Sequence, residues 1–202
     1  MEQPEPGVRR LCVAVAAGTP GLLLAVRRSG RLDRLYVSTD PHSRVEVGVA
    51  PPGVDELGLL RDLVLYLRRE LDKVRPAPPG RVPSRRVPPA GRTLSPPVRT
   101  LSRPVLLVLH VGIVRAVDGG LGGAGADRSR ALAGDREIQT VADRDARDRG
   151  NGAGLAVVVS DGLFADLRAE GLPAMGWKPV STAAAWIRSF NNPPVPRTKS
   201  GA

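Results

Sequence analysis

The segment Leu109-His110-Val111-Gly112-Ile113-Val114 decides the fold of this chain, together with the residues after it up to position 190. It belongs to an apolar run over 105–114, and a glycine-rich run comes next at 119–125. A second apolar run covers 155–159. Short apolar runs bounded by Gly and Ser are typical of buried strands. The pattern predicts strands over both apolar runs and a flexible turn at 119–125.

The clearest helix is predicted upstream of this stretch, over residues 55–74. Leu60, Leu63, Leu67 and Leu71 recur there at three- and four-residue spacing. This spacing places their side chains in one apolar stripe along a helix. Such a stripe indicates core packing rather than a partner site.

Shorter helices are predicted downstream, over residues 127–133 and 161–170. Ser160 directly precedes the second of them and is of a type that caps helices well. Residues 135–150 carry dense charge of mixed sign, which predicts a solvated segment.

The remaining segments complete an alternation of strands and helices. Strands are expected over 8–17, 34–39 and 45–50, a short helix over 21–28, and a closing hairpin from 177–180 and 184–190. This order predicts an α+β fold, in which helices pack over a mainly antiparallel sheet.

Residues 75–104 differ from the rest of the chain in composition. They hold nine prolines and seven arginines without any acidic residue, and the formal net charge of the whole chain is +10. A segment with so few apolar side chains cannot offset the entropy of ordering, so a disordered loop is expected. A disordered tail is expected over 191–202. Because most of the basicity lies in the loop, it argues against a nucleic-acid-binding face.

The other features of the composition point to a cytoplasmic protein. Residues 1–10 are polar and do not resemble a secretory signal. No apolar run approaches the roughly 20 residues that span a bilayer, so no membrane contact is expected. Cys12, the single cysteine, lies in an apolar run and is expected to be a buried, inert thiol.

Five short motifs follow one another in a fixed order. They are residues 45–56, His110-Val111-Gly112, the run from Gly122-Gly123 to Ser129-Arg130, Ser160-Asp161-Gly162-Leu163-Phe164 and Ala185-Trp186-Ile187. Together they resemble the class III nucleotide (adenylate/guanylate) cyclase homology domain, and most closely degenerate actinobacterial cyclase-like domains. The resemblance covers residues 8–190 apart from the loop.

The resemblance implies a single domain over residues 1–190 with a nucleotide-cyclase or ferredoxin-like fold, interrupted by the loop at 75–104. It also implies a nucleotide ligand and a homo- or heterodimer, because cyclase sites form between two subunits.

Active members of the family hold two divalent ions on two aspartates. Here the opening strand ends at Ala17 without a carboxylate, and the region before the strand at 45–50 reads His42-Ser43-Arg44. Glu46 is expected to be an exposed strand residue. No metal, no cofactor and no catalytic residue is therefore expected.

Two basic residues match binding positions of the family. Arg130 lies where the resemblance implies an arginine that stabilises phosphates, and Ala126 stands where the family has a catalytic asparagine. Lys178 is the one candidate for a lysine that recognises the base. The alternative for both Arg130 and Lys178 is an ordinary surface side chain without a binding role, and we favour this alternative.

Other patterns in the sequence lack essential parts of a site. The glycine-rich run has no Lys-Ser/Thr after it and is not a P-loop. Asp143, Asp145 and Asp148 lack the final Glu of a calcium loop and are expected on a solvated face. His110 is expected to be a structural strand residue, and neither a zinc site nor a hydrolase is supported.

The sequence thus favours a catalytically inactive cyclase-like module with a regulatory or nucleotide-binding role. One alternative is a cyclase subunit that is active only with a partner supplying the metal-binding aspartates. Another is nucleic-acid binding through the arginine-rich loop, which has no interleaved aromatic residues.

Overall fold

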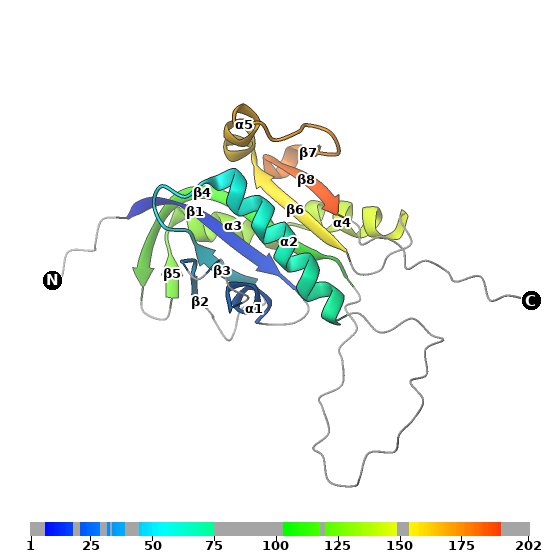
Figure 1. The fold of residues 1–202 in the computed structure, drawn as a ribbon. Coiled ribbons are helices and arrows are strands. Elements are labelled where there is room, and N and C mark those ends of the chain that lie inside the picture. The colour runs from blue at the N-terminus through cyan, green and yellow to red at the C-terminus, as the bar shows by residue number, and fades with distance from the viewer. Residues whose placement is uncertain are drawn as a thin grey trace, which may run out of the picture.

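The computed structural model shows a sheet with helices on both faces (Figure 1). The described residues are 7–17, 21–28, 32, 34–38, 45–74, 103–117, 120–148 and 154–190. The predicted tail at 191–202 lies outside them, and so does the predicted loop at 75–104 except for residues 103 and 104.

The first half of the chain has a β-α-β-β-α-β order. Its elements are β1 (Val8–Ala16), α1 (Leu22–Arg28), β2 (Tyr36–Ser38), β3 (Val45–Val49), α2 (Glu56–Val74) and β4 (Val105–Val117). This is the order of ferredoxin-like folds. The helices and strands predicted for this half are confirmed.

The second half extends the sheet. Its elements are β5 (Gly120–Gly122), α3 (Ala124–Gly134), α4 (Arg136–Asp148), β6 (Leu155–Ser160), α5 (Asp161–Ala169), β7 (Lys178–Val180), the 3-10 turn η1 (Ser181–Ala183) and β8 (Ala185–Phe190). The predicted closing hairpin is confirmed as β7 and β8, which pair antiparallel.

The strands lie in the order β2-β3-β1-β4-β6-β8-β7, and β5 pairs with β4. Among these pairs only β4 and β6 run parallel. A parallel pair needs a crossover connection, which α3 and α4 provide. The α+β class with a mainly antiparallel sheet is therefore confirmed.

Each face of the sheet has its own buried cluster because strand side chains alternate. On the face toward the viewer of Figure 1, Val13 and Val15 lie among residues of α1, α2 and α5. On the opposite face, Cys12 and Ala14 lie among residues of α3 and α4. The strands are buried on both sides, which explains their almost continuous apolar sequence.

The prediction of a flexible turn at 119–125 is wrong for residues 120–125, which are the described part of this run. Residues 120–122 form β5, and α3 begins at Ala124. The glycines serve close packing: a Cβ on Gly112 would lie 2.6 Å from the Cα of Gly125, and a Cβ on Gly125 would lie 2.9 Å from the Sγ of Cys12. Here the lack of a side chain lets α3 approach the backbone of β4 and the thiol of Cys12 on β1.

The prediction of a solvated segment at 135–150 is also wrong for residues 135–148, and residues 149 and 150 lie outside the described part. Asp135 Oδ1 accepts hydrogen bonds from the N–H groups of Glu137 and Ile138, at 2.9 and 3.0 Å, and so caps α4. Ile138 and Ala142 of this helix are buried against the sheet. The cap and the narrow apolar face outweigh the dense charge.

Two further predictions concern helix starts and membrane spans. Ser160 stands at the N-cap position of α5, as expected, but its side chain makes no capping hydrogen bond. No helix in the described part of the chain is long and apolar enough to cross a membrane.

Candidate functional site

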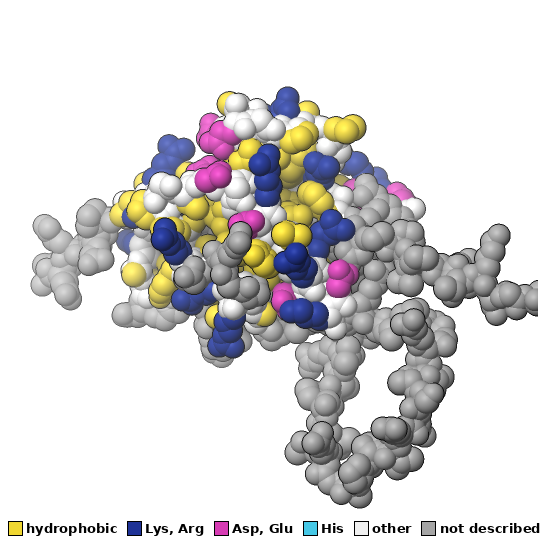
Figure 2. All heavy atoms as spheres, viewed as in Figure 1, with side chains coloured by type: hydrophobic (Ala, Val, Ile, Leu, Met, Phe, Trp, Pro, Cys, Tyr) yellow, Lys and Arg dark blue, Asp and Glu magenta, His cyan; other side chains and the backbone are white. Residues whose placement is uncertain are grey.

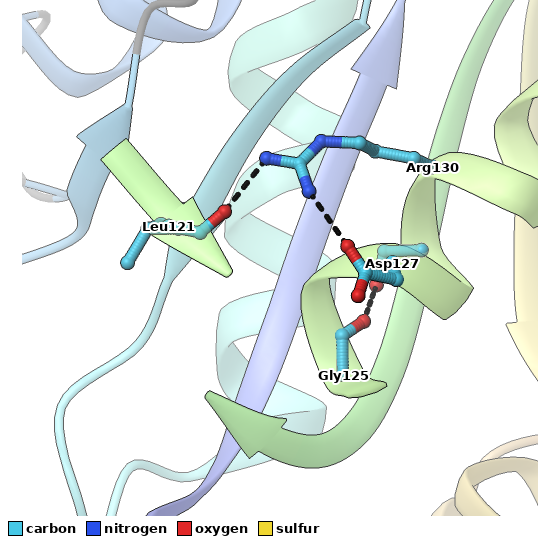
Figure 3. Close-up of polar contacts among 5 residues, drawn as sticks. Leu121, Gly125, Asp127 and Arg130 are labelled. Atoms are coloured by element: carbon cyan, nitrogen blue, oxygen red, sulfur yellow. Dashed lines mark hydrogen bonds and ion pairs between the residues drawn. The ribbon is translucent and has the colours of Figure 1, made fainter. Parts of the chain in front are cut away.

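Arg130 bridges two elements instead of pointing into open space (Figure 3). Its guanidinium donates to Asp127 Oδ1 at 3.1 Å, one turn back on α3, and to the carbonyl oxygen of Leu121 on β5 at 2.8 Å. The side chain is 32% exposed. An arginine has five N–H donors. Arg130 therefore holds β5 against α3 and keeps further donors for a ligand.

Ala126 occupies the position where the resemblance implies a catalytic asparagine. It is fully buried, in the first turn of α3. Two residues on, Arg128 donates to the carbonyl oxygen of Ala183 at 2.5 Å. Near Arg130, α3 thus presents a buried methyl group where the family places an amide.

Lys178 lies at the β7 edge of the sheet and is engaged within the molecule. Its Nζ lies 2.6 Å from Asp145 Oδ1, and Ser189 Oγ donates to Asp145 Oδ2 at 2.9 Å. Lys178 is half-exposed, whereas Asp145 is buried. The prediction that Asp145 lies on a solvated face is therefore wrong, because its carboxylate ties α4 to β7 and β8.

The two basic candidates lie on different parts of the sheet. Arg130 belongs to the region of α3 and β5, over β4 and β1, whereas Lys178 is on the edge strand β7. Among the described residues, the two side chains share no hydrogen-bond or ion-pair partner.

Glu46 is not the exposed strand residue expected, and that prediction is wrong. It is buried on β3, beside Val15 of β1. Its two carboxylate oxygens accept hydrogen bonds from the N–H groups of Gly21 and Leu23, at 2.6 and 2.7 Å. A carboxylate is favourable at the start of a helix, where backbone N–H groups are unpaired. Glu46 therefore caps α1 from the neighbouring strand.

His110 and Ser160 form a polar pair that the motifs did not reveal as a pair. His110 Nδ1 and Ser160 Oγ lie 3.0 Å apart. Burial lowers the pKa of His110 below its ordinary value of 6.5, and the nearby Arg128 guanidinium lowers it further.

A signal for this contact was present in the sequence. Each of the two residues is the first polar side chain after an apolar strand run, and the parallel register joins Leu109 to Val159 one step earlier. His110 and Ser160 come into contact only because β4 pairs with β6 in the folded chain. His110 is thus a strand residue, as predicted, with a partner on β6.

Cys12 is buried beneath α3. Burial raises the pKa of its thiol to about 11, although a hydrogen bond with Ser129 lowers it somewhat. A thiol of this kind is protonated and unreactive at neutral pH. The expected burial of Cys12 is confirmed.

Metal ligands do not gather in the described part of the chain. No group of three or more His, Cys, Asp or Glu side chains there could hold a metal ion. The chain matches no protein-family model and no curated protein. What the site does must therefore be argued from its contacts.

Proposed function

We propose that this chain is a non-catalytic, cyclase-like module with a regulatory or nucleotide-binding role. The proposal rests on the hydrogen bonds that the Glu46 carboxylate accepts. In the resemblance, both metal-binding positions belong to the corner of β1 and β3. Glu46 lies in this corner, and each of its two carboxylate oxygens accepts a hydrogen bond from a backbone N–H group of the chain itself.

A two-metal reaction needs carboxylate oxygens that are free to bind the ions. In phosphoryl chemistry the ions neutralise the phosphate charge and activate the attacking oxygen. Releasing Glu46 for that purpose would leave two N–H groups at the start of α1 without partners, at a cost of about 1–3 kcal/mol for each buried one. The arrangement favours a structural carboxylate over a catalytic one.

Nucleotide binding is supported by Arg130. Its guanidinium is held in place by β5 and α3, is about one third exposed, and uses one donor each to Asp127 and Leu121. A preorganised guanidinium recognises phosphate well because its planar donors match phosphate oxygens. The bond to Asp127 would weaken, since a phosphate competes with that carboxylate for the same cation.

The experiment combines turnover with binding on the full chain. ATP and GTP are incubated with the protein and manganese, and calorimetric titrations with ATP, GTP and cyclic nucleotides are run with and without magnesium. We expect binding of a nucleotide without formation of a cyclic product. Robust cyclic nucleotide production by the chain alone would overturn the proposal, and activity that appears only with a partner carrying the aspartates would favour the heterodimer alternative.

Substitutions test whether nucleotide binding depends on Arg130. Arg130→Ala should weaken nucleotide affinity about tenfold, which corresponds to about 1.4 kcal/mol. The matched control is Arg61→Ala, which removes an exposed arginine from α2 on the opposite face of the sheet. Equal affinities for the two variants would exclude Arg130 as a phosphate ligand.

A further inference from the structure

A polar cluster on the α3 face of the sheet has no part in the proposed function. It consists of His110 on β4, Ser160 at the end of β6 and Arg128 on α3. His110 is two residues after Val108, which is buried under α3 and α4, so both side chains point to that face. The contact of His110 with Ser160 closes the cluster on one side. The bond of Arg128 to the carbonyl oxygen of Ala183 closes it on the other.

Ser160 determines which ring nitrogen of His110 carries the proton. Ser160 is buried and its side chain makes no capping hydrogen bond to α5, so Nδ1 of His110 is its partner among the described residues. A buried hydroxyl group needs an acceptor for its proton. In the neutral ring Nδ1 therefore accepts from Ser160, and Nε2 carries the proton.

The Nε2–H group of His110 is open to a ligand. Nε2 would lie 3.1 Å from a Cβ built on Gly112, so it points toward the place where this side chain is missing, at the contact of β4 with α3. Nε2 has no hydrogen-bond partner among the described residues. In the same part of the chain, only the indole nitrogen of Trp177 is both buried and without a partner. Nε2 of His110 is therefore reached by solvent.

Arg128 supplies a fixed positive charge beside this group. The side chain is exposed, and one of its five N–H donors binds the carbonyl oxygen of Ala183. The next residue, Ala184, has a φ of 45°, in the left-handed region that is unfavourable for a residue with a Cβ. Its N–H donates to Ser181, and its carbonyl oxygen accepts from the N–H of Asp161, so the turn is held on both sides. The guanidinium is thus anchored at one donor and keeps others for a ligand.

The charge around His110 is of one sign. On β1 the neutral thiol of Cys12 lies directly opposite His110, and Arg10 lies two residues away on the same side of the sheet. β6 contributes the uncharged Ser160. Burial lowers the pKa of His110, and Arg128, alone among the described charged groups, lowers it further. An anion between the ring and the guanidinium would cancel this repulsion.

Basic side chains alone would not define a binding site on this protein, because they are common on its surface. Figure 2 shows the opposite face of the sheet, where Lys and Arg side chains lie scattered among acidic and apolar ones. The His110 cluster differs because Ser160 and Ala183 hold its two donors in place. Donors that are already ordered lose little freedom when a ligand binds.

We propose that Arg128 and the Nε2–H group of His110 bind a phosphate-type oxyanion, at a site separate from Arg130. Such an anion carries about two negative charges and several acceptor oxygens, so it can accept from a guanidinium and an imidazole at once. Arg128 and Arg130 are two positions apart on α3, and side chains at this spacing do not face each other. One reaches η1 and the other reaches β5.

The test follows the histidine NMR signals of the full chain against pH, with and without inorganic phosphate. His42, the other histidine of the chain, provides a reference signal, and His42→Gln assigns the two signals. We expect phosphate to raise the pKa of His110, because a bound anion stabilises the protonated ring. Sodium chloride at the same ionic strength controls for screening. The proposal is overturned if phosphate and chloride give His110 the same pKa.

Arg128→Ala distinguishes anion binding from a purely structural role. Without phosphate this variant should raise the pKa of His110, since the repelling charge is gone. Phosphate should then bind about tenfold more weakly, as expected for the loss of one charge-assisted hydrogen bond. The matched controls Arg130→Ala and Arg61→Ala should keep the response of the wild type, and circular dichroism shows that each variant is folded. A response that Arg130→Ala abolishes and Arg128→Ala keeps overturns this proposal and leaves the proposed role of Arg130 intact.

The same titration in the Arg130→Ala variant identifies the source of the anion. Inorganic phosphate and adenosine monophosphate are compared at equal concentrations. A response to phosphate that is at least as strong as the response to the nucleotide assigns the cluster to the free ion. A stronger response to the nucleotide assigns it to a phosphate monoester. The absence of a response to either anion overturns the proposal.

Discussion

On one face of the sheet α2 packs long leucine side chains against the strands, whereas on the other face α3 brings its backbone close to them. Leu63 and Leu67 of α2 are fully buried. In the α3 layer the closest approach involves Gly112 and Gly125. The first layer depends on buried side-chain volume, and the second on the absence of side chains. The two layers should therefore respond to opposite kinds of substitution.

The largest effect is expected in the leucine layer. Leu67→Ala should lower the free energy of unfolding by about 2–5 kcal/mol, because it removes buried apolar contacts and leaves a cavity. Urea denaturation followed by circular dichroism measures this change. Leu65→Ala on the exposed side of the same helix should stay within about 0.5 kcal/mol of the wild type. Equal losses for both variants would mean that α2 does not pack in the orientation described.

The glycine layer should be sensitive to added volume. Gly112→Ala should cost about 1–3 kcal/mol, because the new Cβ meets the backbone of α3 at a distance no packed atoms tolerate. The control is Gly134→Ala at the end of α3, where a Cβ meets nothing within 4 Å. There a gain of about 0.5–1 kcal/mol is expected, since alanine favours the helix more than glycine does. If Gly112→Ala is neutral, the close approach of α3 to β4 is refuted.

A smaller effect should distinguish the partly buried Lys178–Asp145 ion pair of the α4 layer from the more exposed Lys73–Glu70 pair of α2. Lys178→Ala should cost about 1–2 kcal/mol, because the buried Asp145 carboxylate loses its charge-assisted bond to Lys178 and keeps its hydrogen bond from Ser189. Lys73→Ala removes a pair with Glu70 on the surface of α2 and should cost less than about 1 kcal/mol. Thermal unfolding of the two variants in parallel makes the comparison. Equal costs would show that burial of Asp145 does not strengthen the pair.

The smallest effect is a pH dependence in the α3 layer. Since the pKa of His110 is lower in the folded state than its ordinary value of 6.5, the unfolded state binds more protons as the pH falls. Stability from neutral His110 is therefore present above pH 6.5 and is lost at lower pH. His110→Gln should flatten this part of the stability profile, measured by urea denaturation between pH 5 and pH 8 (roughly the range in which histidines titrate). If the slope of stability against pH is the same in His110→Gln as in the wild type, His110 is not the source of this pH dependence.

The same contrast explains which parts of the fold could be predicted. A stripe of leucines at helical spacing is visible in the sequence because every member is apolar, so α2 was open to prediction. The start of α3 was not, because glycines in a close contact look the same in sequence as glycines in a loop. The start of α4 was hidden by charge, although Asp135 provides its cap.

The candidate site divides in a similar way. Motif order singled out Arg130 and Lys178, but not their partners Leu121 and Asp145. Those contacts join residues on separate elements, and no local spacing encodes them. The buried role of Glu46 was missed for the same reason, because its two donors lie more than 20 residues away along the chain.

The sequence by itself determined the alternation of strands and helices and the burial of Cys12, because these depend on local periodicity and on long apolar runs. Tertiary structure alone decided that Glu46 caps α1, that Asp145 holds Lys178, and that glycines bring α3 onto the sheet. Each of these depends on which strands are neighbours. Once β3 lies beside β1 and β4 beside β6, polar groups that are distant in sequence meet, and buried polar groups require such partners.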